Sequence, residues 1–366
     1  MTTDARVIVI GAGIAGASAA FGLARRGVPV IIIDEAAVGQ ATAASAGIIL
    51  PWATASEGTY YDVYADGAAF YPQLLQALAD TGVTKTDYRR TGGLVVNADP
   101  ALLDEAERRV RERRRTAGEI VGNVDRIDKA AARELFPPLS PDLEAVYISG
   151  GGRVDGRTLR DALLGAAVRL GAERRTGRAE VDHEGSHPMI MVDGSRLDAD
   201  VVVLAAGAWT NTVLSKIGIS LPVAPQKGQI THLRVDADTT DWPTVHPISH
   251  HYLVGFDGGR VAVGATRETG SGFDTRVTAA GQLQVLRDAL SIAPGLADAT
   301  LIETRVGLRP LADDLPIAGP VPGREGLYVA TGYGAGGLTM GPLIGDAIAR
   351  RILGEAAPEL DPIAVR

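Results

Sequence analysis

The chain of 366 residues contains no cysteine. Structural disulfides, metal sites with thiolate ligands and a cysteine nucleophile are therefore all excluded. Histidine is scarce too, with six in the whole chain, of which His246, His250 and His251 lie in the segment HPISHH. Their spacing suggests no further convergent ligands, so we expect no bound metal.

Long apolar runs and positive net charge are also missing. No run reaches the length of a membrane span. The N-terminus MTTDARVIVIGAG enters an apolar stretch at once and leaves no room for a signal peptide, so we expect a cytoplasmic protein. The net charge of −8 argues against a nucleic-acid partner. The basic segment RRVRERRR at 108–115 has acids around it and predicts a solvated helix face.

The first 34 residues read as a strand, a helix and a second strand. VIVI at 7–10 is typical of a buried strand, GAGIAG at 11–16 fits G-x-G-x-x-G, and a helix is expected over about 14–26. A second apolar strand at 30–33 ends on Asp34, whose carboxylate suits a ribose hydroxyl and disfavours NADP. The pattern predicts dinucleotide binding, although a glycine-rich turn that binds nothing is the alternative. This stretch does not decide between FAD and NAD.

The rest of the chain predicts two domains. Buried strands at 201–204 and 327–330 repeat the pattern of a strand followed by a small-residue turn, and helices are expected over 57–80, 100–116, 128–135, 208–216, 279–290 and 343–353. Residues 86–97 read as a strand pair, the strands after Gln226 alternate as in an antiparallel sheet, and 304–320 reads as loops. We expect an α/β dinucleotide-binding domain from 1–84, 145–225 and 304–366, and an α+β substrate domain from 85–144 and 226–303.

Several motifs together resemble one family. They are GAGIAG with Asp34, ATAASAGIILPW at 41–52, VVVLAAGAWT at 201–210, GGRVAVGATRE at 258–268, RVGLRPLADDLPIAG at 305–319 and TGYGAGGLTMGPLIGDAIA at 331–349. The chain is similar to the FAD-dependent D-amino-acid oxidase family, in its glycine oxidase, sarcosine oxidase and D-amino-acid dehydrogenase branch. The resemblance implies a Rossmann-type FAD domain interleaved with a mixed or antiparallel-sheet substrate domain. Because cysteine is absent, we expect the FAD to be bound non-covalently.

The resemblance also implies which residues hold the cofactor. Gly11, Gly13 and Gly16 would hold the pyrophosphate, Asp34 the adenosine ribose, and the last helix would point its N-terminus at the flavin. The full set of cofactor residues expected on this basis is Gly11, Gly13, Ile14, Ala15, Gly16, Asp34, Glu35, Thr42, Ala46, Gly47, Val181, Ala206, Gly207, Trp209, Gly334, Gly336, Gly337, Leu338 and Thr339.

For the substrate, Arg309 in GLRP matches the arginine that binds the substrate carboxylate, and His250 and Tyr252 match pocket residues. Residues that are two apart on a strand point to the same face, so we expect His250 and Tyr252 to face one side. Arg267 departs from the family, which has an apolar residue there. It would either read a polar or acidic part of the substrate or pair with Glu268 and face solvent.

Two more departures lie in the glycine-rich turn. Gly336 falls where glycine oxidase has a second arginine, and Tyr333 replaces a histidine whose role this change leaves open.

The implied reaction is FAD-dependent oxidation of glycine, a D-amino acid or a secondary amino acid by hydride transfer to flavin N5. The imino acid would hydrolyse to a keto acid and ammonia, with O2 reoxidising the flavin. One alternative is a dehydrogenase that passes electrons to a quinone or carrier, alone or as a subunit of a larger complex. The others are a protein whose FAD is structural or a tRNA-modifying relative, and an NAD-linked enzyme. The sequence leaves open whether the chain forms a homo-oligomer.

Overall fold

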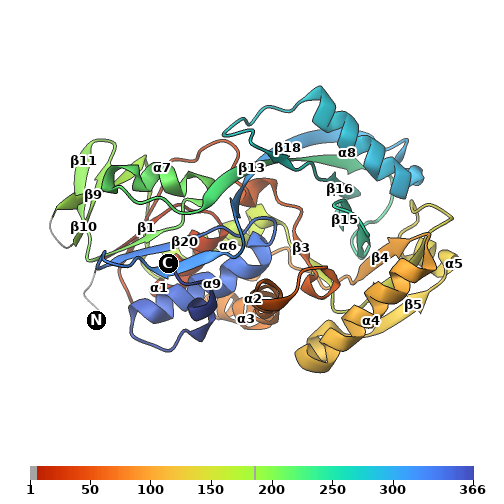
Figure 1. The fold of residues 1–366 in the computed structure, drawn as a ribbon, viewed down its shortest axis with the longest axis horizontal. Coiled ribbons are helices and arrows are strands. Elements are labelled where there is room, and N and C mark those ends of the chain that lie inside the picture. Colours follow the sequence, from red (N-terminus) through yellow and green to blue (C-terminus); the bar gives the residue numbers. More distant parts are fainter. Residues whose placement is uncertain (1–5, 185–186) are drawn as a thin grey trace.

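The computed structural model describes residues 6–184 and 187–366. A six-stranded sheet forms one half of the molecule in the order β19-β20-β12-β1-β2-β8 (Figure 1). Its strands are β1 (Val7–Ile10), β2 (Val30–Asp34), β8 (Glu173–Thr176), β12 (Val201–Leu204), β19 (Ile317–Pro320) and β20 (Leu327–Thr331). All pairings are parallel except β19 with β20, and the strands β1 and β12 are completely buried, as apolar strands between helix layers must be.

Three helices cover this sheet, and they are α1 (Ile14–Ala24), α6 (Gly156–Arg169) and α9 (Gly337–Ile352). Helices α1 and α9 approach each other closely. A Cβ atom on Gly345 of α9 would lie 2.6 Å from the Cβ atom of Ser18 on α1, so glycine permits the contact. A small sheet of β9 (Ala179–Glu184), β10 (His187–Val192) and β11 (Ser195–Asp198), with a turn at Asp193-Gly194, flanks this half.

The other half is a nine-stranded mixed sheet (Figure 1). Its path is β17-β13-β16-β15-β14-β4-β6-β5, and β18 pairs with β13. The strands are β4 (Gly93–Asn97), β5 (Val124–Ile127), β6 (Glu144–Ile148), β13 (Val223–Arg234), β14 (Thr244–Pro247), β15 (Tyr252–Phe256), β16 (Arg260–Gly264), β17 (Glu268–Thr269) and β18 (Thr300–Ala312). Only β14 with β4 is parallel.

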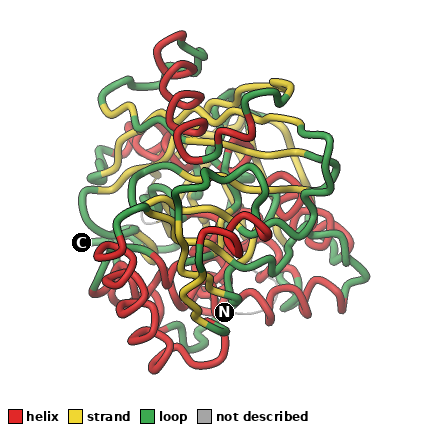
Figure 2. The backbone as a smooth tube through the Cα atoms, turned by 90° about the vertical axis from the view of Figure 1, so that its right-hand side faces the viewer, coloured by secondary structure: helices red, strands yellow, loops and turns green. Residues whose placement is uncertain are grey.

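The remaining elements surround the two halves. They are α2 (Gly58–Ala69), α3 (Tyr71–Asp80), α4 (Pro100–Ala117), α5 (Lys129–Leu135), α7 (Thr210–Leu214), α8 (Ala279–Ile292) and the short pair β3 (Ile48–Ile49) and β7 (Gly152–Arg153). Figure 2, turned by 90°, shows helices on both sides of the strands. In the described part of the chain, no helix has the length and apolar character to cross a membrane.

Three expected elements were wrong. The segment 304–320, expected as loops, begins with the 13-residue strand β18, because β13 pairs with it along its whole length. Pro310 is tolerated because β18 is an edge strand. The expected helix at 57–80 divides into α2 and α3 at Pro72, and only β4 forms within 86–97.

Helix α9 begins at Gly337, six residues before the expected start at 343, although Pro342 lies inside it. A proline at 342 cannot donate the usual hydrogen bond to the carbonyl of Leu338. The buried hydroxyl of Tyr71 donates to that carbonyl instead, at 2.6 Å. A side chain from a distant helix therefore compensates for the missing backbone donor.

The domain division stays a prediction, but three of its boundaries fall inside strands. Residue 145 lies within β6, residue 226 within β13 and residue 304 within β18, and all three strands belong to the nine-stranded sheet. The sheets themselves therefore favour boundaries just outside these strands.

Candidate functional site

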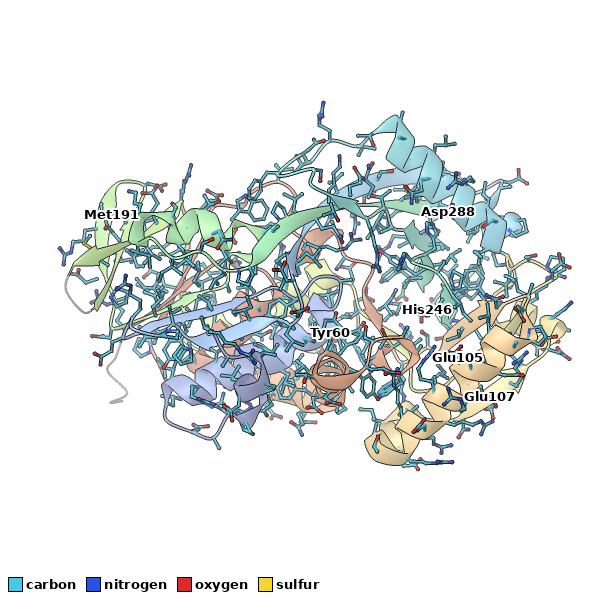
Figure 3. All side chains as sticks on the ribbon, viewed as in Figure 1. Tyr60, Glu105, Glu107, Met191, His246 and Asp288 are labelled. Atoms are coloured by element: carbon cyan, nitrogen blue, oxygen red, sulfur yellow. The ribbon has the colours of Figure 1, made fainter. Side chains whose placement is uncertain are left out.

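A cavity of about 1430 Å³ is lined by residues of both halves. Its wall includes the start of α1, the end of β2, the segment 35–50, the start of α2, and strands β13, β15 and β18 of the large sheet. Figure 3 labels two of its residues, Tyr60 of α2 and His246 of β14, in the central region of the molecule. The wall contains both the glycine-rich turn and the arginines Arg267 and Arg309. The site predicted for the cofactor and the site predicted for the substrate therefore share one cavity.

The turn at 11–16 is built so tightly that it requires glycine. Gly11 has φ of +98°, and a Cβ atom there would lie 2.4 Å from the carbonyl oxygen of Ala205. A Cβ atom on Gly16 would lie 1.9 Å from the carbonyl oxygen of Gly11. The backbone at the start of α1 thus lines the cavity without side chains in the way, as phosphate binding at a helix N-terminus requires.

Asp34 is fixed at the end of β2. Its carboxylate accepts hydrogen bonds from the backbone N–H of Ala12 at 2.6 Å and of Ala36 at 2.7 Å. The side-chain amide of Gln40 donates to it at 3.0 Å. A carboxylate has about four lone-pair directions, so these three donors leave one for a ribose hydroxyl.

Most of the expected cofactor residues line the cavity. They are Gly11, Gly13, Ile14, Ala15, Asp34, Glu35, Thr42, Ala46, Gly47, Ala206, Gly207, Trp209, Gly334, Gly336, Gly337 and Leu338. Gly16, Val181 and Thr339 do not. Gly16 packs on Gly11, Val181 is buried in the core, and the Thr339 hydroxyl donates to the carbonyl of Ile48 at 3.3 Å. Gln40 and Arg178 also line this end, although no motif in the sequence pointed to them.

Arg309 and Tyr252 lie together at the other end. The Arg309 Nη1 atom donates to the carbonyl oxygen of Thr266 at 3.1 Å, and its guanidinium lies near enough to the Tyr252 side chain to favour the ionised hydroxyl. Burial raises the pKa of Tyr252, so its hydroxyl stays protonated at neutral pH. The guanidinium rests on Gly228 of β13, where a Cβ atom would lie 2.4 Å from Nη2.

Arg267 lines the same cavity and does not pair with Glu268. The Glu268 carboxylate accepts from Thr266 Oγ1 at 2.6 Å and from the Gln229 amide at 2.7 Å, and it lies 3.5 Å from Lys227 Nζ. Burial and the charge of Arg309 lower the pKa of Arg267. Within the described residues, neither Arg267 nor Arg309 forms an ion pair with a carboxylate.

The histidines differ from the expected arrangement. His250 lies in an exposed bend before β15, which begins at Tyr252, so the two do not share a strand, although both line the cavity. His246, which no expectation singled out, lines it too. Burial lowers the pKa of His246 to about 4 and therefore keeps it neutral. No group of three or more His, Asp or Glu residues in the described ranges could hold a metal ion.

The two departures in the glycine-rich turn have structural consequences. A Cβ atom on Gly336 would lie 2.5 Å from Met340 Cε and 3.2 Å from the Tyr60 hydroxyl, so these side chains occupy the space that a longer residue at 336 would take. The Tyr333 side chain lines the cavity, and its hydroxyl is buried without a hydrogen-bond partner.

FAD fits this cavity. The N-termini of α1 and α9 both lie in its wall, and Asp34 lies at the end of β2 beside the first of them. The N-terminus of α1 suits the pyrophosphate. The positive end of the α9 dipole suits the negative charge of a reduced flavin. The space beyond, at Arg309 and Tyr252, is left for a small substrate.

Comparisons with known proteins agree with this assignment. The family model described as FAD dependent oxidoreductase, DAO, matches residues 6–351. The uncharacterized oxidoreductase YurR of Bacillus subtilis is 44% identical, with 97% of this chain and 96% of YurR covered. Glycine oxidase of Geobacillus kaustophilus is 31% identical, covering 100% of this chain and 97% of its own. The crystal structure of iminodiacetate oxidase from Chelativorans sp. BNC1 has a TM-score of 0.95 at 46% identity, with 98% of each chain covered.

The glycine-rich turn, the acid at the end of β2 and the matching family model lead to one conclusion. The chain belongs to the DAO family of FAD-dependent oxidoreductases.

Proposed function

We propose that this enzyme oxidises the C–N bond of a secondary amino acid with two carboxylates, such as iminodiacetate. The observation that carries the proposal is the pair Arg267 and Arg309, which face one cavity without a carboxylate partner among the described residues. Arg267 is exposed and Arg309 is half-buried, and their two positive charges in one cavity attract a dianion, whose carboxylates a guanidinium can bind bidentately. The name of the iminodiacetate oxidase supports a substrate of this class.

Each residue then has a defined task. Arg309 and the protonated Tyr252 hold the carboxylate next to the reacting carbon, which orients its C–H bond. Arg267 holds the second carboxylate. The neutral His246 also lines the cavity and adds no fixed charge there, and the exposed His250 belongs to the same wall. We assign FAD to the glycine-rich end, held by Gly11, Gly13 and Asp34 with the start of α9.

The reaction balances with one cofactor and one acceptor. Bound FAD supplies the two-electron chemistry, in which a hydride leaves the substrate carbon and the amine loses a proton. The imine product takes up water and divides into a 2-oxo acid and a primary amino acid, which are glyoxylate and glycine for iminodiacetate. We propose that O2 takes the two electrons and becomes H2O2. An electron carrier in place of O2 is the alternative.

Anaerobic bleaching of the flavin absorbance tests the substrate. We expect iminodiacetate to bleach it at lower concentration than glycine or sarcosine, and admitted air to restore it quickly. Bleaching by glycine alone would overturn the dicarboxylate, and colour that returns only with an added carrier would overturn the O2 assignment.

A variant of Arg267 tests whether this residue binds the second carboxylate of the substrate. Arg267→Met should lower kcat/KM for iminodiacetate at least tenfold and leave sarcosine nearly unchanged, because only the dicarboxylate uses the second guanidinium. Arg287→Met, on the exposed face of α8, is the control and should change neither. Equal losses for both substrates would show that Arg267 does not read the second carboxylate.

A further inference from the structure

A second arm of the cavity extends away from the cofactor end along the face of the large sheet. The register of β14 on β15 pairs Val245 with Leu253 and therefore places His246 across from Tyr252. The parallel pairing of β14 with β4 then places Val95 beside His246. Val95, His246 and Tyr252 all line the cavity, so the wall continues across three neighbouring strands.

Arg109 of α4 forms the far end of this arm. Helix α4 packs Leu103, Ala106 and Val110 into the same core as Val95, which directs Arg109 to the same side. The Arg109 side chain is 18% exposed, and its Nε atom is buried without a hydrogen-bond partner. Its Nη1 atom lies 3.3 Å from the carboxylate of Glu105, which is itself 59% exposed. The enclosed Nε atom does not reach the open cavity, but the Nη2 atom has no hydrogen-bond partner among the described residues, so this cavity-lining guanidinium keeps donor capacity beside Glu105.

This arm is one way in for a substrate. The exposed residues Ala55, Ile248 and His250 belong to its wall, so it reaches solvent. The exposed Arg267 shows that the cavity also opens nearer Arg309. A small molecule that enters through this arm passes Arg109 and the neutral His246 before it reaches Arg309.

Charge explains why an arginine is useful there. The whole chain carries a net charge of −8 and repels a dianionic substrate. Charges act over about 8–10 Å at physiological salt, so a single cation at the opening changes the local potential where the overall charge is screened.

We propose that Arg109 is an outer carboxylate-binding residue, which captures the anionic substrate before it reaches Arg309. The ligand class rests on the proposed function, because the captured molecule is the amino dicarboxylate itself. Glu105 competes with the substrate for the guanidinium and tunes its affinity.

Steady-state kinetics with iminodiacetate test the proposal. Arg109→Gln should raise KM three- to tenfold with kcat unchanged, and should weaken the fall of kcat/KM with increasing ionic strength. Glu105→Gln should lower KM, because it releases the guanidinium. Arg108→Gln is the matched control, since Arg108 lies one residue away, is 70% exposed and pairs with Glu112. An unchanged KM in Arg109→Gln, the same change in Arg108→Gln, or a KM in Glu105→Gln at or above the wild-type value would overturn it.

A second measurement separates this proposal from the proposed function. If iminodiacetate does not bleach the wild-type flavin, the proposed reaction is wrong, and malonate then serves as an unreactive dicarboxylate. Its titration is followed by the change in flavin absorbance. Weaker malonate binding in Arg109→Gln than in Arg108→Gln would still support the outer site, and equal dissociation constants would overturn it.

Discussion

At the scale of single residues, the site depends on what lies beneath its arginine. Arg309 is on an edge strand, and its guanidinium rests on the bare backbone of Gly228, which the β13–β18 pairing places two residues along from its partner Gln226. The sequence predicted Arg309, Tyr252 and Arg267 from motifs. It could not predict Gly228, because that contact depends on the register between β13 and β18, and the sequence of β18 was interpreted as loops.

Gly228→Ala should therefore damage binding and spare the fold. The three atoms nearest to the new Cβ atom all belong to the guanidinium of Arg309, at 2.4–2.6 Å, and the end of a flexible side chain can move aside. We expect KM for the amino acid to rise at least tenfold, with the thermal midpoint within about 2 °C of the wild type. Gly165→Ala is the control, because its Cβ atom meets nothing within 4 Å, and it should leave KM unchanged. A large loss of stability in Gly228→Ala would contradict this account.

At the scale of elements, the basic helix α4 does more than present charge to solvent. Six arginines lie in 108–115, and the expectation of a solvated face is wrong for Arg113, which is 8% exposed. It donates to the carbonyls of Trp52, Thr54 and Ser56 at 3.0, 2.6 and 2.5 Å, and its guanidinium lies 3.8 Å from the ring centre of Tyr61. The segment 52–56, which forms part of the second arm of the cavity, is thereby held against α4.

Arg113→Met should loosen this segment. The change leaves three carbonyls without their donor and removes the ring contact, which we expect to cost roughly 2–4 kcal/mol of the free energy of unfolding. Urea unfolding measures that loss, and hydrogen exchange of 50–57 should increase first. Arg114→Met is the control, because Arg114 lies 3.8 Å from the exposed Glu119 and holds no loop. Unchanged exchange over 50–57 would show that the segment is held by other contacts.

Two of the misread elements, β18 and the start of α9, have the same physical cause. Prolines at 310 and 342 indicated breaks, yet both lie inside regular structure, since β18 is an edge strand and Tyr71 replaces the donor in α9. Both compensations come from residues far away in the chain, so local sequence could not reveal them. The first 34 residues were predicted well, because that unit is specified by its own glycines and apolar strands.

At the scale of the whole molecule, the described core holds histidines that must stay neutral. Burial lowers the pKa of His246 to about 4, and burial with the charges of Arg305 and Arg260 lowers that of His232 to about 3. Burial also lowers the pKa of His251. In the unfolded chain, each would titrate near its ordinary pKa of about 6.5.

The free energy of unfolding should therefore fall as the pH decreases from 6.5 to 4.5. In this range the unfolded chain binds protons that the folded protein does not bind, so His232 and His246 each lower the free energy of unfolding by about 1 kcal/mol per pH unit. His251 acts in the same direction. Above pH 7 both states are neutral and the effect vanishes. Asp155 and Asp346, whose pKa is lowered, act mainly below about pH 4.5. Burial raises the pKa of Asp66, which acts in the opposite direction and reduces the slope. Urea unfolding at pH 7.5, 6.5, 5.5 and 4.5 measures the slope, and His246→Asn should reduce it by the share of one proton. If the free energy of unfolding has the same pH slope in His246→Asn as in the wild type, His246 is protonated in the folded protein. The second arm of the cavity would then carry a second cation beside Arg109.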